Sequence, residues 1–287
     1  MGALFVIIAG SLWGAMGIFV RGLASCGLSS IEICFVRMLV ATLLMTGYFF
    51  IFDRKSLKIK LRDIWCFIGT GVLSLTFFGY CYFTTIQMTS MSVAAVLLYT
   101  SPVFVLLLSA LFFRERITKR KIGCVLVAII GCAFVSGIIG NFGVAGLSTK
   151  GILFGLGSGL GYGLYSIFGR FAINRKYSAM TITYYSFLFS TLALLFLTKP
   201  MEIFTKLNSG RVDINIYYVI GTAIVVTILP YIFYTLGLTK IENSKAAVLA
   251  CIEPIMATLL GFLVFHEVLS IGEILGVVLV LIAIILL

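Results

Sequence analysis

The chain has 287 residues, of which 61% are hydrophobic and 11% are charged, and its formal net charge is +11. In a soluble domain about a quarter of the residues are charged on average. The composition therefore excludes a soluble domain and predicts a chain that is solvated by lipid. Spans of roughly 20 residues each would use most of the length and leave no room for a soluble catalytic domain.

Ten apolar runs long enough to cross a bilayer follow one another along the chain. Only a tight polar turn at residues 87–90 separates the third run from the fourth, and we expect a short interfacial helix in the polar stretch 199–213. The pattern predicts an all-α membrane protein with ten transmembrane helices. The runs occupy residues 3–21, 29–52, 64–87, 91–113, 120–139, 151–173, 178–198, 214–239, 244–265 and 270–287.

Lysine and arginine are distributed unevenly between the loops. Of the 21 basic residues, fifteen lie in or beside the second, fourth, sixth and eighth loops, five belong to the other loops, and Arg37 lies within the second run. Basic loops of membrane proteins face the cytoplasm, so we expect both chain termini there. Because the positive charge is confined to these loops, it does not indicate nucleic acid as a partner.

The two halves of the sequence resemble each other. Residues 13–21 align with 162–170 at an offset of 149, while 94–102 align with 246–254, and 113–118 with 265–270, at an offset of 152. Each half, 1–140 and 150–287, holds five runs, and an odd number of spans reverses the direction of the second half. The sequence therefore predicts two inverted five-helix repeats around a central cavity, as in secondary transporters that bind substrate near the membrane midplane.

Several short motifs recur in register in both halves, and in them the chain resembles the EamA-type drug/metabolite transporter superfamily. The resemblance covers nearly the whole chain. It implies ten helices, most of them around a central cavity, and export of amino acids or related metabolites. The motifs are an aromatic residue before glycine (Trp13-Gly14, Tyr162-Gly163), a proline within a span (Pro102, Pro254), a glutamate that closes the span (Glu115, Glu267) and a glycine soon after it (Gly123, Gly276).

Glu253 is the strongest candidate for a functional group. It lies about ten residues into the ninth run, where a charge costs several kcal/mol, and the first half has Ser101 at the same place. It is either a protonated or paired structural carboxylate, or a group that contacts an amino or cationic part of the substrate or couples transport to protons.

Arg37 is the second candidate, about eight residues into the second run, with Ser186 as its counterpart. It could bind a substrate carboxylate with two hydrogen bonds, pair with Glu32, or extend to the lipid headgroups. For Glu32 and Glu273 the sequence predicts capping boxes at helix starts. A gate-like interaction stays open for Glu115 and Glu267.

Other residues are expected to line or shape the cavity. Pro102 and Pro254 free a backbone carbonyl one turn earlier, and we expect bends there that act as gating points, with tolerated kinks as the alternative. Glycines at every fourth position of the first and sixth runs predict close helix packing. The substrate-binding candidates, mostly aromatic residues at mid-run or matched positions, are Trp13, Arg37, Tyr80, Tyr82, Tyr99, Ser101, Tyr162, Tyr231, Tyr234 and Glu253.

We expect a secondary transporter of the bacterial inner membrane that exports an amino acid or similar small polar metabolite by alternating access. Export of cationic or aromatic drug-like compounds, or import by the same fold, is the alternative. The sequence has no catalytic dyad, nucleotide-binding loop or cluster of metal ligands, so we expect no enzyme activity, cofactor or metal. The expected partners are the substrate and the lipid bilayer, with the protein as a monomer or weak homodimer.

Overall fold

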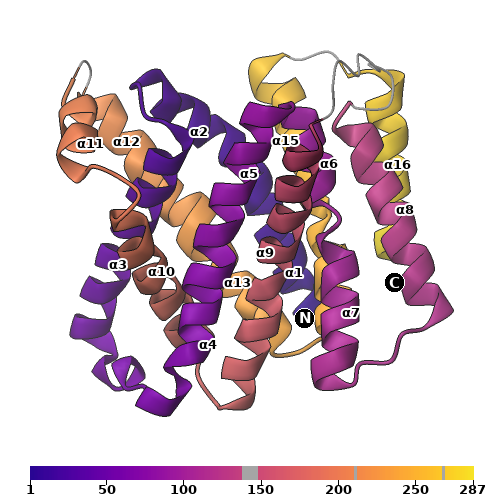
Figure 1. Ribbon diagram of the computed structural model, residues 1–287, viewed down its shortest axis with the longest axis horizontal. Helices are drawn as coiled ribbons and strands as arrows, with labels where there is room; N and C mark the ends of the chain where they lie inside the picture. The colour runs from indigo at the N-terminus through magenta and orange to yellow at the C-terminus, as the bar shows by residue number, and fades with distance from the viewer. Residues whose placement is uncertain (138–147, 210–211, 267–268) are drawn as a thin grey trace.

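The computed structural model describes residues 1–137, 148–209, 212–266 and 269–287 (Figure 1), and all regular structure in these ranges is helical. Glu267 lies outside the described residues. The helices of the first half are α1 (Gly2–Gly14), α2 (Met16–Ser25), α3 (Ser30–Phe52), the 3-10 turns η1 (Arg54–Leu57) and η2 (Leu61–Asp63), α4 (Ile64–Ile68), the π-helical η3 (Gly69–Thr76), α5 (Phe77–Met88), α6 (Met91–Leu98), α7 (Ser101–Phe113) and α8 (Lys119–Val135).

The second half repeats this order of elements with small differences. A short helix, α11, occupies the polar stretch in which the sequence predicts one. The helices are α9 (Thr149–Asn174), α10 (Ala179–Leu195), α11 (Pro200–Leu207), α12 (Val212–Ala223), the π-helical η4 (Ile224–Ile228), α13 (Leu229–Leu238), α14 (Asn243–Ala250), α15 (Ile252–Phe265) and α16 (Ile271–Ile285).

Two helix starts have the capping boxes that the sequence predicts. The Glu32 carboxylate accepts a hydrogen bond from the Ser29 backbone N–H at 2.6 Å, and the Glu273 carboxylate accepts one from the Ser270 N–H at 2.7 Å. Each box satisfies two backbone donors that a helix start leaves without partners. This prediction is confirmed.

The number of membrane spans is confirmed only in part. Seven helical segments of the described chain are long and apolar enough to cross a membrane, and α10 with α11, bent by 101°, would make an eighth. The remaining two, α8 with 17 residues and α16 with 15, fall short of the roughly 20 residues that a span needs. They pack on each other so closely that a Cβ on Gly131 would lie 2.9 Å from the Val280 nitrogen. Ten spans therefore stay a prediction.

The chain runs alternately up and down in Figure 1, so that loops gather at two ends of the molecule. The loops after α3, α7, α9 and α13 lie at the lower end, and both chain termini lie toward it. These are the four loops that carry most of the basic residues, and we call this end the basic face. The loops after α2, α5 and α10 and the last turn of α15 lie at the other end, the opposite face.

Helix interruptions recur at matching places in the two halves. α6 and α7 are separated at Tyr99–Thr100, and α14 and α15 at Cys251, so the first residues of α7 and α15 lie 151 positions apart. The π-helical stretches end at Thr76 and Ile228, at the offset of 152 that aligns the sequences. π-Helical turns and helix breaks are uncommon, so their recurrence supports a repeated fold.

The breaks also explain where the two prolines lie. Pro102 is the second residue of α7 and Pro254 the third residue of α15. In a first turn the missing N–H costs no hydrogen bond within the helix, because that donor has no partner there in any case. The expected bends thus occur as complete breaks just before the prolines. A gating role for these residues stays a prediction.

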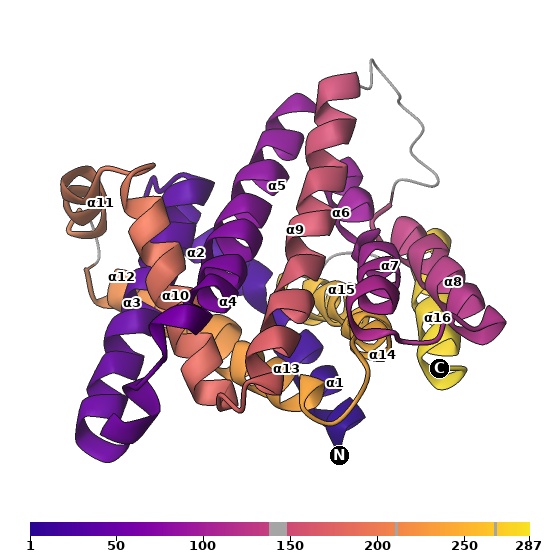
Figure 2. The ribbon, with the colours of Figure 1, turned by 60° about the horizontal axis from the view of Figure 1, so that its bottom comes forward.

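A close helix contact is repeated between the halves. A Cβ on Gly14 of α1 would lie 2.8 Å from the carbonyl oxygen of Glu253, and one on Gly163 of α9 would lie 3.4 Å from the carbonyl oxygen of Ser101, the counterpart of Glu253. The path from α1 to α2 and the path along α9 run in opposite directions (Figure 1 and Figure 2). Both observations agree with inverted repeats, which stay a prediction.

Candidate functional site

Five aromatic residues from both halves of the chain meet at one point, and we call them the aromatic cage: Trp13, Tyr162, Tyr165, Tyr231 and Tyr234. The Trp13 ring lies 5.1 Å from the ring of Tyr231, 5.4 Å from that of Tyr234 and 6.0 Å from that of Tyr162. Ser74, Leu75 and Phe78 of the first half complete the walls of a narrow cavity of about 10 Å³. The cavity has room for about one water molecule.

The tyrosine hydroxyls of the cage are held by side chains around it. The Tyr234 hydroxyl and Ser166 Oγ share a hydrogen bond of 2.8 Å, and the Tyr165 hydroxyl and Thr235 Oγ1 share one of 2.9 Å. The Tyr162 hydroxyl donates to Glu253 Oε2 at 3.0 Å. Because three of the rings are fixed at their polar ends, the cage presents a shaped aromatic surface.

Glu253 reaches the cage from the first turn of α15, next to the break at Cys251. It is half-buried, and the start of a helix favours a carboxylate because the helix dipole is positive there. Tyr82 and Tyr99 lie within electrostatic reach of this carboxylate. Ser101, its counterpart, is buried at the start of α7.

Arg37 of α3 is buried close to the same place, with 5% of its surface exposed. Nη1 donates to the thioether sulfur of Met16 at 3.0 Å, and Nε is buried without a hydrogen-bond partner. Glu32, its expected alternative partner, instead accepts from Lys206 at 2.8 Å. The low exposure also does not fit a side chain that extends to lipid headgroups. Arg37 and Glu253 interact electrostatically with each other, and both do so with Tyr231.

The structure brings together most, but not all, of the predicted substrate-binding residues. Tyr82 stacks on Phe78, which in turn packs on Tyr162, so Tyr82 lies one ring away from the cage. Tyr80 is 48% exposed and packs on Phe154, away from the cage, so the structure does not bring it together with the other candidates, and its role in substrate binding stays a prediction.

Sequence reasoning missed Tyr165, which belongs to the cage. Its ring lies 5.0 Å from that of Tyr231, and its side chain is 3% exposed. It follows Tyr162 by three positions on α9, and residues at this spacing lie on the same helix face. That spacing was the available signal.

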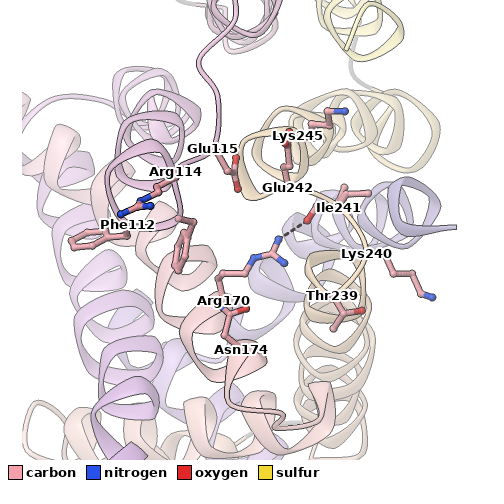
Figure 3. A pocket seen from close by; sticks show the side chains of 11 residues that line it. Phe112, Arg114, Glu115, Arg170, Asn174, Thr239, Lys240, Ile241, Glu242 and Lys245 are labelled. Carbon is pink, nitrogen blue, oxygen red and sulfur yellow. Dashed lines mark hydrogen bonds between the residues drawn. The ribbon is translucent and has the colours of Figure 1, made fainter.

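A second and larger cavity, of about 770 Å³, opens at the basic face between α7, α9 and the start of α14. Figure 3 shows Arg170 and Glu115 pointing into it, while the ends of Lys240 and Lys245 point away. Arg170 donates through Nε to Asn243 Oδ1 at 2.8 Å and through Nη2 to the carbonyl of Ile241.

An ion pair borders this cavity. The Lys121 ammonium lies 2.8 Å from the Glu242 carboxylate. The hydrogen bond from Lys121 holds the pKa of Glu242 below its ordinary value. The Glu242 carboxylate is therefore ionised at neutral pH and paired with Lys121.

The comparison with known proteins agrees with this geometry. The sequence profile of the EamA-like transporter family matches residues 1–137 and again residues 149–287. An uncharacterized transporter of Archaeoglobus fulgidus is 28% identical over 275 residues, which cover 94% of this chain and 90% of that protein. The uncharacterized inner membrane transporter YicL of Salmonella typhimurium is 27% identical over 296 residues, which cover 99% and 94%.

Two further matches are more limited. The pseudopaline exporter CntI of Pseudomonas aeruginosa is 28% identical over 134 residues, which cover 47% of this chain and 45% of that protein. A solved crystal structure matches with a TM-score of 0.81 at 16% identity, and the match covers 99% of this chain and 95% of that one. At this identity the match shows a shared fold alone.

The family assignment covers both halves of the chain and therefore the cage and the cavity between them. Among the described residues, no group of three or more His, Cys, Asp or Glu side chains could hold a metal ion. The chain belongs to the EamA-like transporter family, and it is a multi-pass membrane transporter rather than an enzyme.

Proposed function

We propose that the protein exports an amino acid or a similar small zwitterion across the bacterial inner membrane by alternating access. In this proposal the substrate binds at the aromatic cage, whose cavity now has room for about one water molecule and widens when the two halves of the chain rock about it to expose it to each side in turn. The basic face lies in the cytoplasm with both termini, as expected from its charge. The partial match to a protein named as an exporter supports the direction of transport.

The observation that carries the proposal is the presence of two opposite charges, the buried Arg37 and the half-buried Glu253, at an aromatic surface. Arg37 has a buried nitrogen without a partner, and Glu253 is held by one tyrosine hydroxyl. Leaving a buried donor unsatisfied is costly, so such a group persists where a ligand completes its hydrogen bonds. A substrate carboxylate would meet the guanidinium while its amino group meets Glu253, with the side chain against the cage.

The test is counterflow of radiolabelled amino acids in proteoliposomes that contain the purified protein. We expect uptake of at least one amino acid by the wild-type protein, and a loss of tenfold or more, roughly what one charged hydrogen bond supplies, in both Glu253→Gln and Arg37→Met. Glu202→Gln and Lys199→Met are matched controls, because those two residues form an exposed ion pair at the start of α11. Both should transport as the wild type does.

The pattern of losses separates the proposed substrate from its rivals. Transport of cationic or aromatic compounds that depends on Glu253 and not on Arg37 would replace the zwitterion with a drug-like substrate. A proton gradient that accelerates wild-type transport but not that of Glu253→Gln would assign proton coupling to this carboxylate. No loss in either variant would remove the cage from the substrate path.

A further inference from the structure

We propose that Glu115 and the N-terminus of α14 form a latch between the two halves of the chain, which closes the transporter at the basic face in its resting state. The inference rests on the alternating access of the proposed function. It assigns a role to the Glu115 carboxylate that is independent of which substrate is carried.

Glu115 lies two residues after the end of α7 and reaches across to the other half of the chain. Its carboxylate accepts hydrogen bonds from the Asn243 N–H at 2.8 Å, the Ser244 N–H at 3.2 Å and Ser244 Oγ at 2.6 Å. Asn243 is fully buried and the side chain of Glu115 is 9% exposed. A carboxylate of the first half thus caps a buried helix of the second half.

Charged side chains surround this contact and strengthen it. Lys121, also of the first half, lies 2.8 Å from Glu242 and 3.9 Å from Glu115. Arg170 holds the same turn from the α9 side, through Asn243 and the carbonyl of Ile241. Separation of the halves at this face would break a group of charged hydrogen bonds that water replaces only in part.

The two counterpart helices differ in how their first turns are capped. The counterpart of α14 is α6, whose N-cap residue Ser90 accepts a hydrogen bond from the Val93 N–H at 3.2 Å. The N-cap residue of α14, Glu242, makes no such bond. When the halves separate, α6 therefore keeps the cap that Ser90 supplies, whereas α14 loses the one that Glu115 supplies. The first turn of α14 thus depends on the contact between the halves.

The latch also adjoins the aromatic cage. The Ser166 carbonyl accepts a hydrogen bond from Asn243 Nδ2 at 3.4 Å, and Ser166 Oγ shares one with the Tyr234 hydroxyl. Ser166 lies one helical turn before Arg170 on α9. Glu115 itself lines the large cavity of the basic face (Figure 3). The latch therefore connects this cavity with the cage through Asn243 and Ser166, and in this proposal it blocks the path from one to the other.

The experiment measures from which side the cage is reached. Ser74→Cys, in the wall of the cage, is the reporter in full-length protein whose seven native cysteines are replaced by alanine. A membrane-impermeant maleimide is applied to right-side-out and to inside-out vesicles. We expect labelling mainly from the outside, and in Glu115→Ala an increase of roughly tenfold from the cytoplasmic side, the size that loss of a helix cap predicts. Glu202→Ala should leave the ratio unchanged.

A double variant separates a latch from a purely structural cap. Glu115→Ala with Glu242→Ser gives α14 a cap within its own half, as Ser90 gives α6. Hydrogen exchange of residues 241–250 should increase in Glu115→Ala and return toward the wild-type rate in the double variant. Labelling from the cytoplasmic side should stay high in both, because the contact between the halves is still missing.

The outcomes distinguish this inference from the proposed function, since none of these measurements needs a substrate. Unchanged sidedness in Glu115→Ala, wild-type sidedness in the double variant, or a wild-type cage labelled mainly from the cytoplasm would each overturn the latch. A reporter that no variant exposes to either side would overturn alternating access, and the latch with it. Failure to transport amino acids would overturn the substrate alone.

Discussion

Arg37 is an unusual residue for the interior of a membrane protein, because its charge is buried and only in part satisfied. Its Nη1 has a thioether sulfur as acceptor, which is weak, and its Nε has none. A buried charge with incomplete hydrogen bonds costs stability, and an apolar residue of similar length at the same place does not carry this cost. If the only role of Arg37 were to stabilise the fold, we would expect its buried guanidinium to have its hydrogen bonds satisfied.

We therefore predict that Arg37→Met abolishes transport and yet stabilises the folded protein. The free energy of unfolding should rise by about 1 kcal/mol or more, which is a few degrees in the midpoint of thermal unfolding for a chain of this size. Thermal unfolding in detergent measures the effect, with Lys199→Met as a control that should change nothing, since that side chain is 76% exposed. A clear decrease in the midpoint would mean that the guanidinium holds the fold together.

At the scale of helices, close contacts between glycine and backbone position the two halves of the cage. A Cβ on Gly14 would lie 2.5 Å from the Met256 Cβ and 2.9 Å from the Ala257 nitrogen, distances that real Cβ atoms do not show. The contact places Trp13, the neighbour of Gly14, beside α15, which carries Glu253. Without a hydrophobic driving force between helices in lipid, such packing supplies much of their association.

Gly14→Ala should therefore destabilise the protein by about 1–3 kcal/mol, because backbone atoms cannot move aside as a flexible side chain can. Gly17, three positions further on, is the matched control. A Cβ there meets nothing within 4 Å, so Gly17→Ala should be neutral or slightly stabilising through helix propensity. The two variants are compared by thermal unfolding in one detergent. Equal midpoints would show that α1 does not pack on α15 in this way.

The sequence predicts the helices well and their interruptions poorly. Each of the ten apolar runs falls on helical structure among the described residues, and the turn before Met91 lies where hydropathy predicts it, because apolar runs and polar turns differ in composition. The breaks at Tyr99 and Cys251 lie within continuous apolar sequence, and hydropathy has no signal for them. Pro102 and Pro254 indicate that a break is near only because a proline stands at the same place in both halves.

The residues of the candidate site are likewise predicted from the sequence only in part. Trp13, Tyr162 and Tyr234 stand at matched or mid-run positions, and the structure places them in one cage. Tyr80 meets the same criteria and faces outward, because a position along a run does not define a helix face. The contact of Glu115 with α14 joins residues 128 positions apart in different halves, and only the folded arrangement reveals it.

At the scale of the whole molecule, the inverted relation of the halves decides whether the cage can face both sides in turn. α2 and α9 are counterparts in the repeat, and their last turns lie at the opposite face and the basic face respectively (Figure 1). Rocking of two inverted halves exchanges the roles of these faces. Two halves that ran in the same direction would not provide this exchange.

The prediction concerns the side on which the two helices end. In protein without native cysteines, Ser25→Cys at the end of α2 should react with an impermeant maleimide in right-side-out vesicles, and Asn174→Cys at the end of α9 only in inside-out vesicles. Both positions are exposed, so a lack of reaction from one side reports sidedness and not burial. The expected sides follow from the basic loops, which predict that residue 174 lies in the cytoplasm. Reaction of both residues from the same side would rule out inverted halves, and a cage between them could not then open to each side by one motion.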